Sequence, residues 1–390
     1  METRTIAMAT ATQFLLMLGF TVILPIGPDI ATDLGLPIAG LGLLTSSYAL
    51  AGFVTGLCSA GLLDRYDRRS PLTLALVLIG LANIGASYAH HLPMLMLMRF
   101  IAGGCSGIGT ALLTAIVADT VSPSRRGRAF AMVLGTGPLV SIIGVPIAIQ
   151  LAAIASWRLP LLLLGLTALV LMTLAHFALP PITAHLDSPS RPAGFQLNYA
   201  IHRPVFRAAI AGIFTMTFAF GLLTANNASL LMLNLHLPRD WLAMFYMSCG
   251  SVTFALLRLV GRMMDRLGPL TFILPAAVSF SGGVLLSYVL PVGLAVGAAA
   301  MCVTIISIST LSVSMTTLTL QAPDPAERAG FGALLGALQY LASGAGAAVS
   351  SGLLTDLPGP RLGNTQFVGL LAIGAVLLVP FTARQLRRHL

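Results

Sequence analysis

The chain has 390 residues; hydrophobic residues make up 57% of it and charged residues only 8%. About a quarter of the residues of a soluble domain are charged, so this composition excludes a soluble protein of this length. The net charge of +9 comes from arginines in short, separate turns. That scatter excludes a continuous basic surface, and we expect no nucleic-acid partner.

Long apolar runs without the alternation of strands predict membrane-spanning helices, each of about 20 residues. In the first half of the chain they are expected at 6–28, 41–63, 71–89, 92–118, 129–154 and 159–179. In the second half they are expected at 207–231, 241–263, 269–290, 292–320, 329–353 and 364–383. The fold class expected is an all-α polytopic membrane protein with twelve transmembrane helices. They would form two pseudo-symmetric six-helix bundles, 1–180 and 207–390, joined by a polar, proline-rich linker, 181–206.

The positions of the arginines predict the orientation of the chain. All 21 basic residues are arginine. Sixteen lie at one side of the predicted spans, Arg99 and Arg258 lie within spans, and the remaining three are at the other side: Arg158, Arg239 and Arg361. The positive-inside rule places the arginine-rich side in the cytoplasm. We therefore expect a multi-pass protein of the inner (plasma) membrane with both termini and the linker in the cytoplasm.

The four cysteines, Cys58, Cys105, Cys249 and Cys302, are spread over four predicted spans without a CxxC pair. We interpret them as buried thiols, with neither a disulfide nor a metal site. No phosphate-binding loop, dinucleotide motif or metal-binding histidine spacing occurs in the sequence. We therefore expect a protein that is not an enzyme and uses no cofactor, with the proton as the candidate coupling ion.

One short charged turn occurs twice, 201 residues apart, each time after the second span of its half. The first copy contains Asp64, Arg65, Arg68 and Arg69; the second contains Gly261, Asp265, Arg266 and Gly268. Carboxylates beside guanidinium groups at helix ends predict a latch on the cytoplasmic side, and the duplication favours it. The alternative is a solvated loop that only sets topology.

Arg99 lies inside the fourth predicted span, where a charged side chain needs a partner or water and indicates a functional role. The alternative is that Arg99 extends to the outer interface. The same helical face carries Thr110. Further polar positions in spans are Gln13, Thr21, Tyr48, Thr224, Asn226, Asn227, Ser307 and Ser314. For the hydroxyl groups, hydrogen bonding to their own helix is the alternative to a binding role.

These motifs together resemble the major facilitator superfamily, and within it the twelve-span drug:proton antiporters and metabolite exporters. Their loop signature after span 2 is matched here by Leu62, Asp64, Arg65, Arg68, Arg69 and Leu72, while Ala60 and Asp67 replace its two glycines. Leu95, Arg99 and Gly103 match the signature of span 4. Span 5 contains the packing motif Gly144-Val145-Pro146, and span 11 contains Gly336-Ala337-Leu338-Gln339-Tyr340.

The resemblance implies that spans 1, 4, 7 and 10 line a central cavity containing the polar positions above. It implies that Asp64 helps to stabilise an outward-open state, and that Gly144 and Pro146 shape the contact between the halves. Gln339 and Tyr340 join the candidate binding residues through the same resemblance.

The function expected is secondary active efflux of a small amphipathic organic solute, a drug-like compound or a metabolite such as a sugar or nucleobase. Alternating access with proton antiport is the expected mechanism. Carboxylates lie only in loops or near span ends, so a neutral or anionic solute is favoured over a cation. Asp29, at the outer end of span 1, is the candidate titrating group, and we expect it to be coupled to Arg99. An uncoupled facilitator or importer is one alternative, and a membrane sensor or scaffold is another. The expected partners are the solute and the lipid bilayer, with the chain as a monomer.

Overall fold

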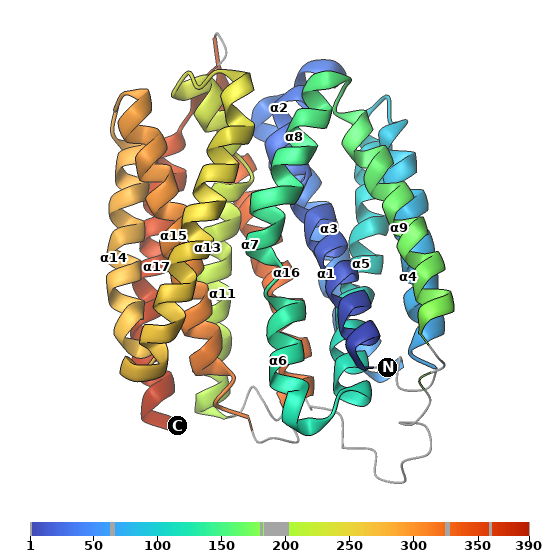
Figure 1. Ribbon diagram of the computed structural model, residues 1–390. Coiled ribbons are helices and arrows are strands. Elements are labelled where there is room, and N and C mark those ends of the chain that lie inside the picture. Colours follow the sequence, from blue (N-terminus) through green and yellow to red (C-terminus); the bar gives the residue numbers. More distant parts are fainter. Residues whose placement is uncertain are drawn as a thin grey trace.

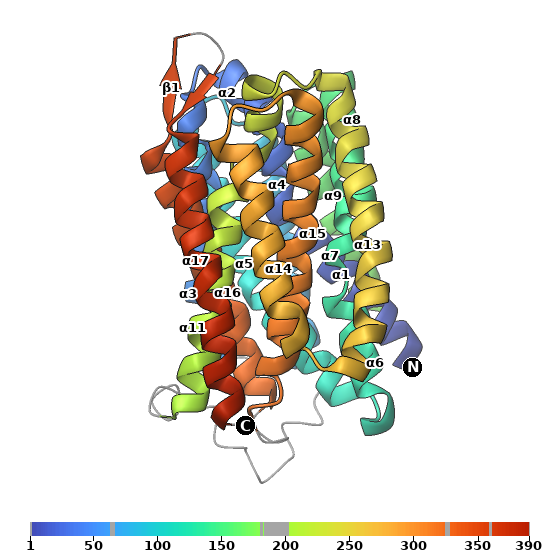
Figure 2. The same ribbon diagram turned by 90° about the vertical axis from the view of Figure 1, so that its left-hand side faces the viewer.

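The computed structural model describes residues 2–62, 67–179, 182, 203–323, 328–358 and 361–389. Long helices run roughly parallel to one another, with the first half of the chain on one side and the second half on the other (Figure 1). Both termini lie at the same end of the molecule, which we call the terminal face; the other end, where strands β1 and β2 lie, is the opposite face (Figures 1 and 2).

The N-terminal half contains the following elements, of which η1 is a 3-10 helix and η3 a π-helix. They are α1 (Glu2–Thr21), α2 (Ile23–Leu34), η1 (Ile38–Leu41), α3 (Gly42–Leu62), α4 (Arg69–Ser87), α5 (Leu92–Thr120), α6 (Pro123–Leu134), α7 (Gly137–Leu139), η3 (Val140–Gly144), α8 (Val145–Ile154) and α9 (Arg158–Ala178).

The C-terminal half contains the following elements, of which η4 and η6 are π-helices and η5 a 3-10 helix. They are α11 (Pro204–Thr224), α12 (Asn227–Ser229), η4 (Leu230–Asn234), η5 (Arg239–Trp241), α13 (Leu242–Leu267), α14 (Leu270–Val284), η6 (Leu285–Val289), α15 (Leu294–Thr319), α16 (Arg328–Leu353), β1 (Thr355–Leu357), β2 (Arg361–Gly363) and α17 (Thr365–His389).

Among the described residues, ten helices are long and apolar enough to cross a membrane, or eleven if α1 and α2 form one bent span. Helix α16 is not among them. It nevertheless lies inside the bundle, packed against α3, α5 and α11. The predicted spans therefore correspond to the observed helices, with ends that differ by a few residues.

Several predicted spans are interrupted where a proline or a pair of polar residues disturbs the backbone hydrogen bonds of the helix. The first span bends by 40° between α1 and α2, just before Pro25. The π-helix η3 precedes Pro146, whose nitrogen has no hydrogen to donate to the preceding turn. In the seventh span the helix breaks at Ala225 and Asn226, so the asparagine pair lies at a break and not within a continuous helix.

The two halves contact each other closely along α3 and α16 and along α8 with α13. Gly42, at the start of α3, shows how tight the first contact is: a Cβ added there would lie 3.1 Å from the carbonyl carbon of Ala347 in α16. The halves are thus in direct backbone contact near the opposite face, and opening that face requires these helices to separate.

Two features differ from the sequence expectations. Cys249 of α13 and Cys302 of α15 form a disulfide, with Cα atoms 5.5 Å apart; Cys58 is exposed, and only Cys105 is a buried free thiol. The prediction of four buried, unpaired cysteines is therefore wrong, because the sequence does not show that α13 and α15 bring their cysteines to the same depth. In addition, β1 and β2 form an antiparallel hairpin in a segment for which no strand was expected.

Candidate functional site

Arg99 of α5 is fully buried, which contradicts the alternative that it extends to the membrane interface. Its Nη1 donates to the carbonyl oxygen of Gly19 at 2.7 Å, and its Nη2 lies 3.4 Å from that of Phe20. The guanidinium carbon lies 4.3 Å from the centre of the Tyr48 ring. All three groups are neutral, so dipoles and a π-face stabilise the charge, and no carboxylate is bonded to it in the described part of the chain.

Three aromatic rings from both halves of the chain gather beside Arg99. Phe20 of α1 lies 5.6 Å from Tyr48 of α3, measured between ring centres, and 6.0 Å from Tyr340 of α16. Tyr48 and Tyr340 are 6.5 Å apart. The Tyr48 hydroxyl lies 2.5 Å from Ser106 Oγ, which fixes its ring. We call Phe20, Tyr48 and Tyr340 the aromatic cluster; it joins Arg99 to the interface between the halves.

Other predicted binding positions bond to their own helices. The hydroxyls of Thr21, Thr224 and Ser314 donate to the carbonyl oxygens four residues earlier, at 2.9, 2.8 and 2.8 Å. For these three, the alternative of hydrogen bonding within the helix is confirmed. Ser307 is buried in α15, and Gln339 of α16 is half-buried beside Tyr340 in the sequence.

Among the predicted positions of the N-terminal half, Gln13 Oε1 of α1 is buried without a protein partner in the described part of the chain, which makes it a candidate to bind a solute or water. Thr110 of α5, on the same helix as Arg99, interacts through its side chain with Tyr340 of α16.

The asparagine pair at the break after α11 bonds to side chains of its own half. Asn226 Nδ2 donates to Ser350 Oγ at 3.1 Å, while Asn227 Oδ1 accepts from the Tyr288 hydroxyl at 2.5 Å. Asn227 thus connects the seventh span to η6, and its amide oxygen is occupied. Of the side-chain atoms of this asparagine pair, Asn226 Oδ1 is buried without a hydrogen-bond partner among the described residues.

Asp29 pairs with Arg239, and the structure does not bring it together with Arg99. Arg239 Nη2 lies 2.6 Å from Asp29 Oδ2, and its Nε lies 3.2 Å from Oδ1. Asp29 belongs to α2 and Arg239 to η5, so this two-point ion pair joins the two halves at the opposite face. Sequence reasoning counted Arg239 only as a loop arginine and missed this role.

A second carboxylate joins the halves at the same face. Asp356 of β1 accepts from the backbone nitrogen of Ile38 at 3.0 Å and from that of Ala39 at 3.2 Å. The hairpin of the C-terminal half thus caps the start of the helix that leads into α3, where free N–H groups favour a carboxylate. Asp356 was not predicted, since nothing in its local sequence separates it from a solvated loop aspartate.

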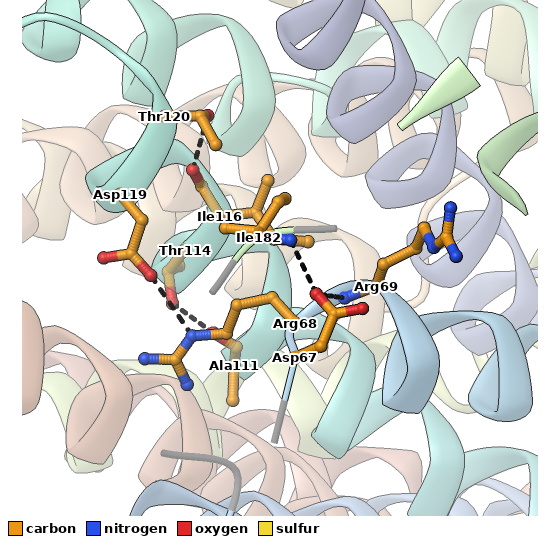
Figure 3. Close-up of polar contacts among 9 residues, drawn as sticks. All are labelled: Asp67, Arg68, Arg69, Ala111, Thr114, Ile116, Asp119, Thr120 and Ile182. Carbon is orange, nitrogen blue, oxygen red and sulfur yellow. Dashed lines mark hydrogen bonds and ion pairs between the residues drawn. The ribbon is translucent and has the colours of Figure 1, made fainter. Parts of the chain in front are cut away.

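At the terminal face, the loop before α4 binds neighbouring segments, as Figure 3 shows. Arg68 Nε lies 3.2 Å from Asp119 Oδ2 at the end of α5. Arg69 donates to the carbonyl oxygens of His176 and Leu179 at the end of α9, both at 3.2 Å. Asp67 Oδ1, in the place of a signature glycine, accepts from the backbone nitrogen of Ile182 at 2.6 Å. Asp64 and Arg65, the other predicted latch residues of this copy, lie outside the described residues.

The second copy of the turn differs from the first, since Asp265 and Arg266 are both exposed. Gly268 ends α13 with a φ of 80°, a conformation that glycine adopts without strain, and a Cβ at Gly261 would meet nothing within 4 Å. In the described part of the chain, the latch interactions are those of the first copy.

In the packing motif of the fifth span, Gly144 faces its own half, whereas Val145 belongs to a buried apolar cluster formed mostly by residues of the C-terminal half. A Cβ at Gly144 would lie 2.9 Å from Leu18 Cδ1 of α1, and Pro146 lies in the first turn of α8. The backbones of the two halves come close one helical turn before Gly144: a Cβ added at Gly250 of α13 would lie 3.1 Å from the carbonyl carbon of Ser141.

Comparison with known proteins agrees with this architecture. Residues 9–351 match the Major Facilitator Superfamily, and the chain belongs to that family. It therefore has the fold of a multi-pass membrane transporter, with twelve transmembrane helices in two pseudo-symmetric six-helix bundles.

The relatives are diverse. The chain is 28% identical over 215 residues to the quinolone resistance protein NorA of Staphylococcus aureus strain MRSA252, covering 54% of this chain and 53% of NorA. It is 30% identical over 219 residues to the 4-hydroxybenzoate transporter PcaK of Pseudomonas aeruginosa strain PAO1, covering 51% and 48%. These alignments span about half the length of each relative. The fold is similar to that of a bacterial homologue of the human lysosomal transporter Spinster in an inward-facing conformation, with a TM-score of 0.75 and 15% identity over 100% of this chain and 98% of the other.

Proposed function

We propose that the protein is a proton-coupled efflux transporter that moves small neutral or anionic amphipathic organic solutes across the bacterial inner membrane by alternating access. The observation that carries this proposal is the Asp29–Arg239 ion pair, because it joins the two halves through a group that can bind a proton. The face closed by this pair opens only when the pair breaks.

The orientation follows from the charge distribution. The arginines around the loop before α4 and those at the end of α17 lie at the terminal face, together with both termini. The positive-inside rule then makes the terminal face cytoplasmic, and the opposite face, with Asp29, Arg239 and Asp356, faces outward.

Proton coupling is assigned to Asp29. When the halves separate at the outward side, its carboxylate loses Arg239 and meets water. Protonation there removes the attraction between the two side chains and favours the outward-open state. For antiport, Asp29 would keep the proton while the outward side closes and would release it toward the cytoplasm once the inward side is open, and the ion pair with Arg239 would then form again. Each cycle would move a proton inward and a solute outward, so the proton gradient would bias the cycle toward export.

The charge of the solute is inferred from the surroundings of Arg99. A cationic solute at this depth would meet a buried guanidinium with no carboxylate beside it, and an unpaired buried charge costs several kcal/mol. A neutral solute can use the free oxygen of Gln13, and an anion can use Arg99. The relatives, a quinolone resistance protein and a 4-hydroxybenzoate transporter, support the choice of small organic solutes.

The direction of transport has one competing candidate, uptake by the same fold. The decisive experiment is flux in proteoliposomes with a panel of anionic, neutral and cationic solutes, with and without a pH gradient of either sign. Export is expected only with an inward proton gradient. Equal fluxes with and without the gradient would refute coupling, and saturable export of a quaternary ammonium dye would refute the solute preference.

A further inference from the structure

We infer that Arg99, Phe20 and Tyr48 form the binding subsite for a flat aromatic carboxylate, which Tyr340 covers in the observed conformation. The carboxylate would bind the guanidinium of Arg99, and the ring would lie against Phe20 and Tyr48. This inference rests on the proposed function, because it names the chemical class of solute for the same central region.

The first argument is the unmatched charge of Arg99. Its side chain is fully buried, yet among the described residues it is bonded only to two backbone carbonyl oxygens and stacked on one ring. A buried, uncompensated charge inside the membrane is expensive and is retained for a function. An anionic ligand supplies the missing counter-charge.

The second argument is the free edge of the guanidinium. Nη1 is held by Gly19 at 2.7 Å, whereas Nε is buried without a partner among the described residues. Nη2, on the same edge as Nε, has only a 3.4 Å contact with Phe20. An arginine edge with two parallel N–H groups matches the two oxygens of a carboxylate. The guanidinium of Arg99 is thus held in one orientation, while this edge still has hydrogen-bond donors for a ligand.

The third argument is the shape of the aromatic cluster. Phe20 and Tyr340 meet edge to face, with an interplanar angle of 89° and ring centres 6.0 Å apart. Phe20 and Tyr340 are both half-buried, whereas Tyr48 is buried and fixed by Ser106. A flat ring that takes the place of Tyr340 against Phe20 and Tyr48 would keep the same stacking and edge contacts, which are worth more than area burial alone.

The fourth argument is that the cluster spans the moving interface. Phe20, Tyr48 and Arg99 belong to the N-terminal half, and only Tyr340 comes from the C-terminal half. In the observed conformation Tyr340 covers the other two rings. When the halves separate, Tyr340 moves with its own half and leaves an aromatic surface beside a cation. The subsite is therefore available in one state and covered in the other, as alternating access requires.

The test is direct binding to the full-length protein in lipid nanodiscs, which depends on neither the direction of transport nor the coupling ion. Benzoate, benzamide and benzamidinium have nearly the same flat shape and carry charges of −1, 0 and +1. Competition against radiolabelled benzoate should rank benzoate first, with the other two at least about tenfold weaker. Cyclohexanecarboxylate, with the charge but without the flat ring, should also bind more weakly than benzoate.

Variants then locate the site. Phe20→Ala removes a ring that the ligand would lie against and should weaken benzoate binding at least about fivefold, whereas Tyr340→Ala removes only the covering ring and should bind benzoate at least as tightly as the original chain. Arg99→Lys keeps a charge but lacks the flat edge, so the preference for benzoate over benzamide should shrink. The matched control is Arg258→Gln, which removes the other arginine within a span. Arg258 is exposed on α13 and stacks on Phe254 at 4.6 Å, so benzoate binding should not change.

The outcomes separate this inference from the proposed function. Benzamide or benzamidinium binding as tightly as benzoate would overturn it, as would undiminished benzoate binding in a well-folded Phe20→Ala protein. Absence of saturable benzoate binding in a protein that still exports other solutes would also overturn it, while leaving the proposed function in place. Thermal unfolding and gel filtration establish that each variant is folded. The competition experiment with the four ligands uses the unsubstituted chain, so it tests the charge preference independently of any variant.

Discussion

Breaking the Asp29–Arg239 ion pair should open the opposite face. Two unit charges about 4 Å apart attract each other by about 4 kcal/mol at an effective dielectric constant of about 20. Solvent reaches 23% of the Arg239 side chain and 28% of the Asp29 side chain, so screening and desolvation reduce the net contribution to about 1–3 kcal/mol. Asp29→Asn is therefore expected to raise the ratio of open to closed molecules about 5- to 150-fold.

The populations of open and closed molecules can be measured by double electron–electron resonance spectroscopy. Spin labels at His90, between α4 and α5, and at Leu290, after η6, report the separation of the two halves, since both residues are exposed at the opposite face. Asp29→Asn should increase the fraction of long distances. The exchanged pair, Asp29→Arg with Arg239→Asp, should return it toward the original value.

Asp33 provides a matched control four residues further along α2. Its carboxylate lies 2.6 Å from Arg158 Nη1, and both residues belong to the N-terminal half. Asp33→Asn removes a similar ion pair without touching the interface, so the distance distribution should stay unchanged. Equal distributions for Asp29→Asn and Asp33→Asn would refute the reasoning, because the effect would not depend on joining the halves.

Three further substitutions have defined outcomes. Asp356→Ala removes the cap on the first helix turn before α3 and should shift the same distance distribution toward the open state; an unchanged distribution would argue against the cap. Asn227→Ala removes one of the two acceptors of the buried Tyr288 hydroxyl, which keeps the carbonyl oxygen of Leu223 at 3.0 Å, so it should cost about 0.5–1.5 kcal/mol and lower the midpoint of thermal unfolding; an unchanged midpoint would count against this contact. Asp67→Gly restores the signature glycine but removes the acceptor for the backbone of Ile182, so protease cleavage just after α9 should become faster; an unchanged rate would count against this contact.

Some functional residues could be predicted from local sequence alone. Arg99 is conspicuous because a charge within an apolar run is costly wherever the helix packs, and its complete burial agrees with a functional role. The loop arginines Arg68 and Arg69 were found through their place in a short motif at a helix end. Phe20 was missed, because one phenylalanine in an apolar span looks like any other lipid-facing or core residue.

The sequence determined the helices, since a run of about 20 apolar residues must satisfy its backbone internally in a bilayer. It also determined which spans contain costly polar groups. Only the tertiary structure decided which groups meet. Arg239 is 210 residues from Asp29, Asp356 is 318 from Ile38, and Cys302 is 53 from Cys249. Hydropathy reports how a segment partitions between water and lipid, and it contains no information about which helix faces fit together. The ion pair, the cap and the aromatic cluster therefore followed from packing between distant segments.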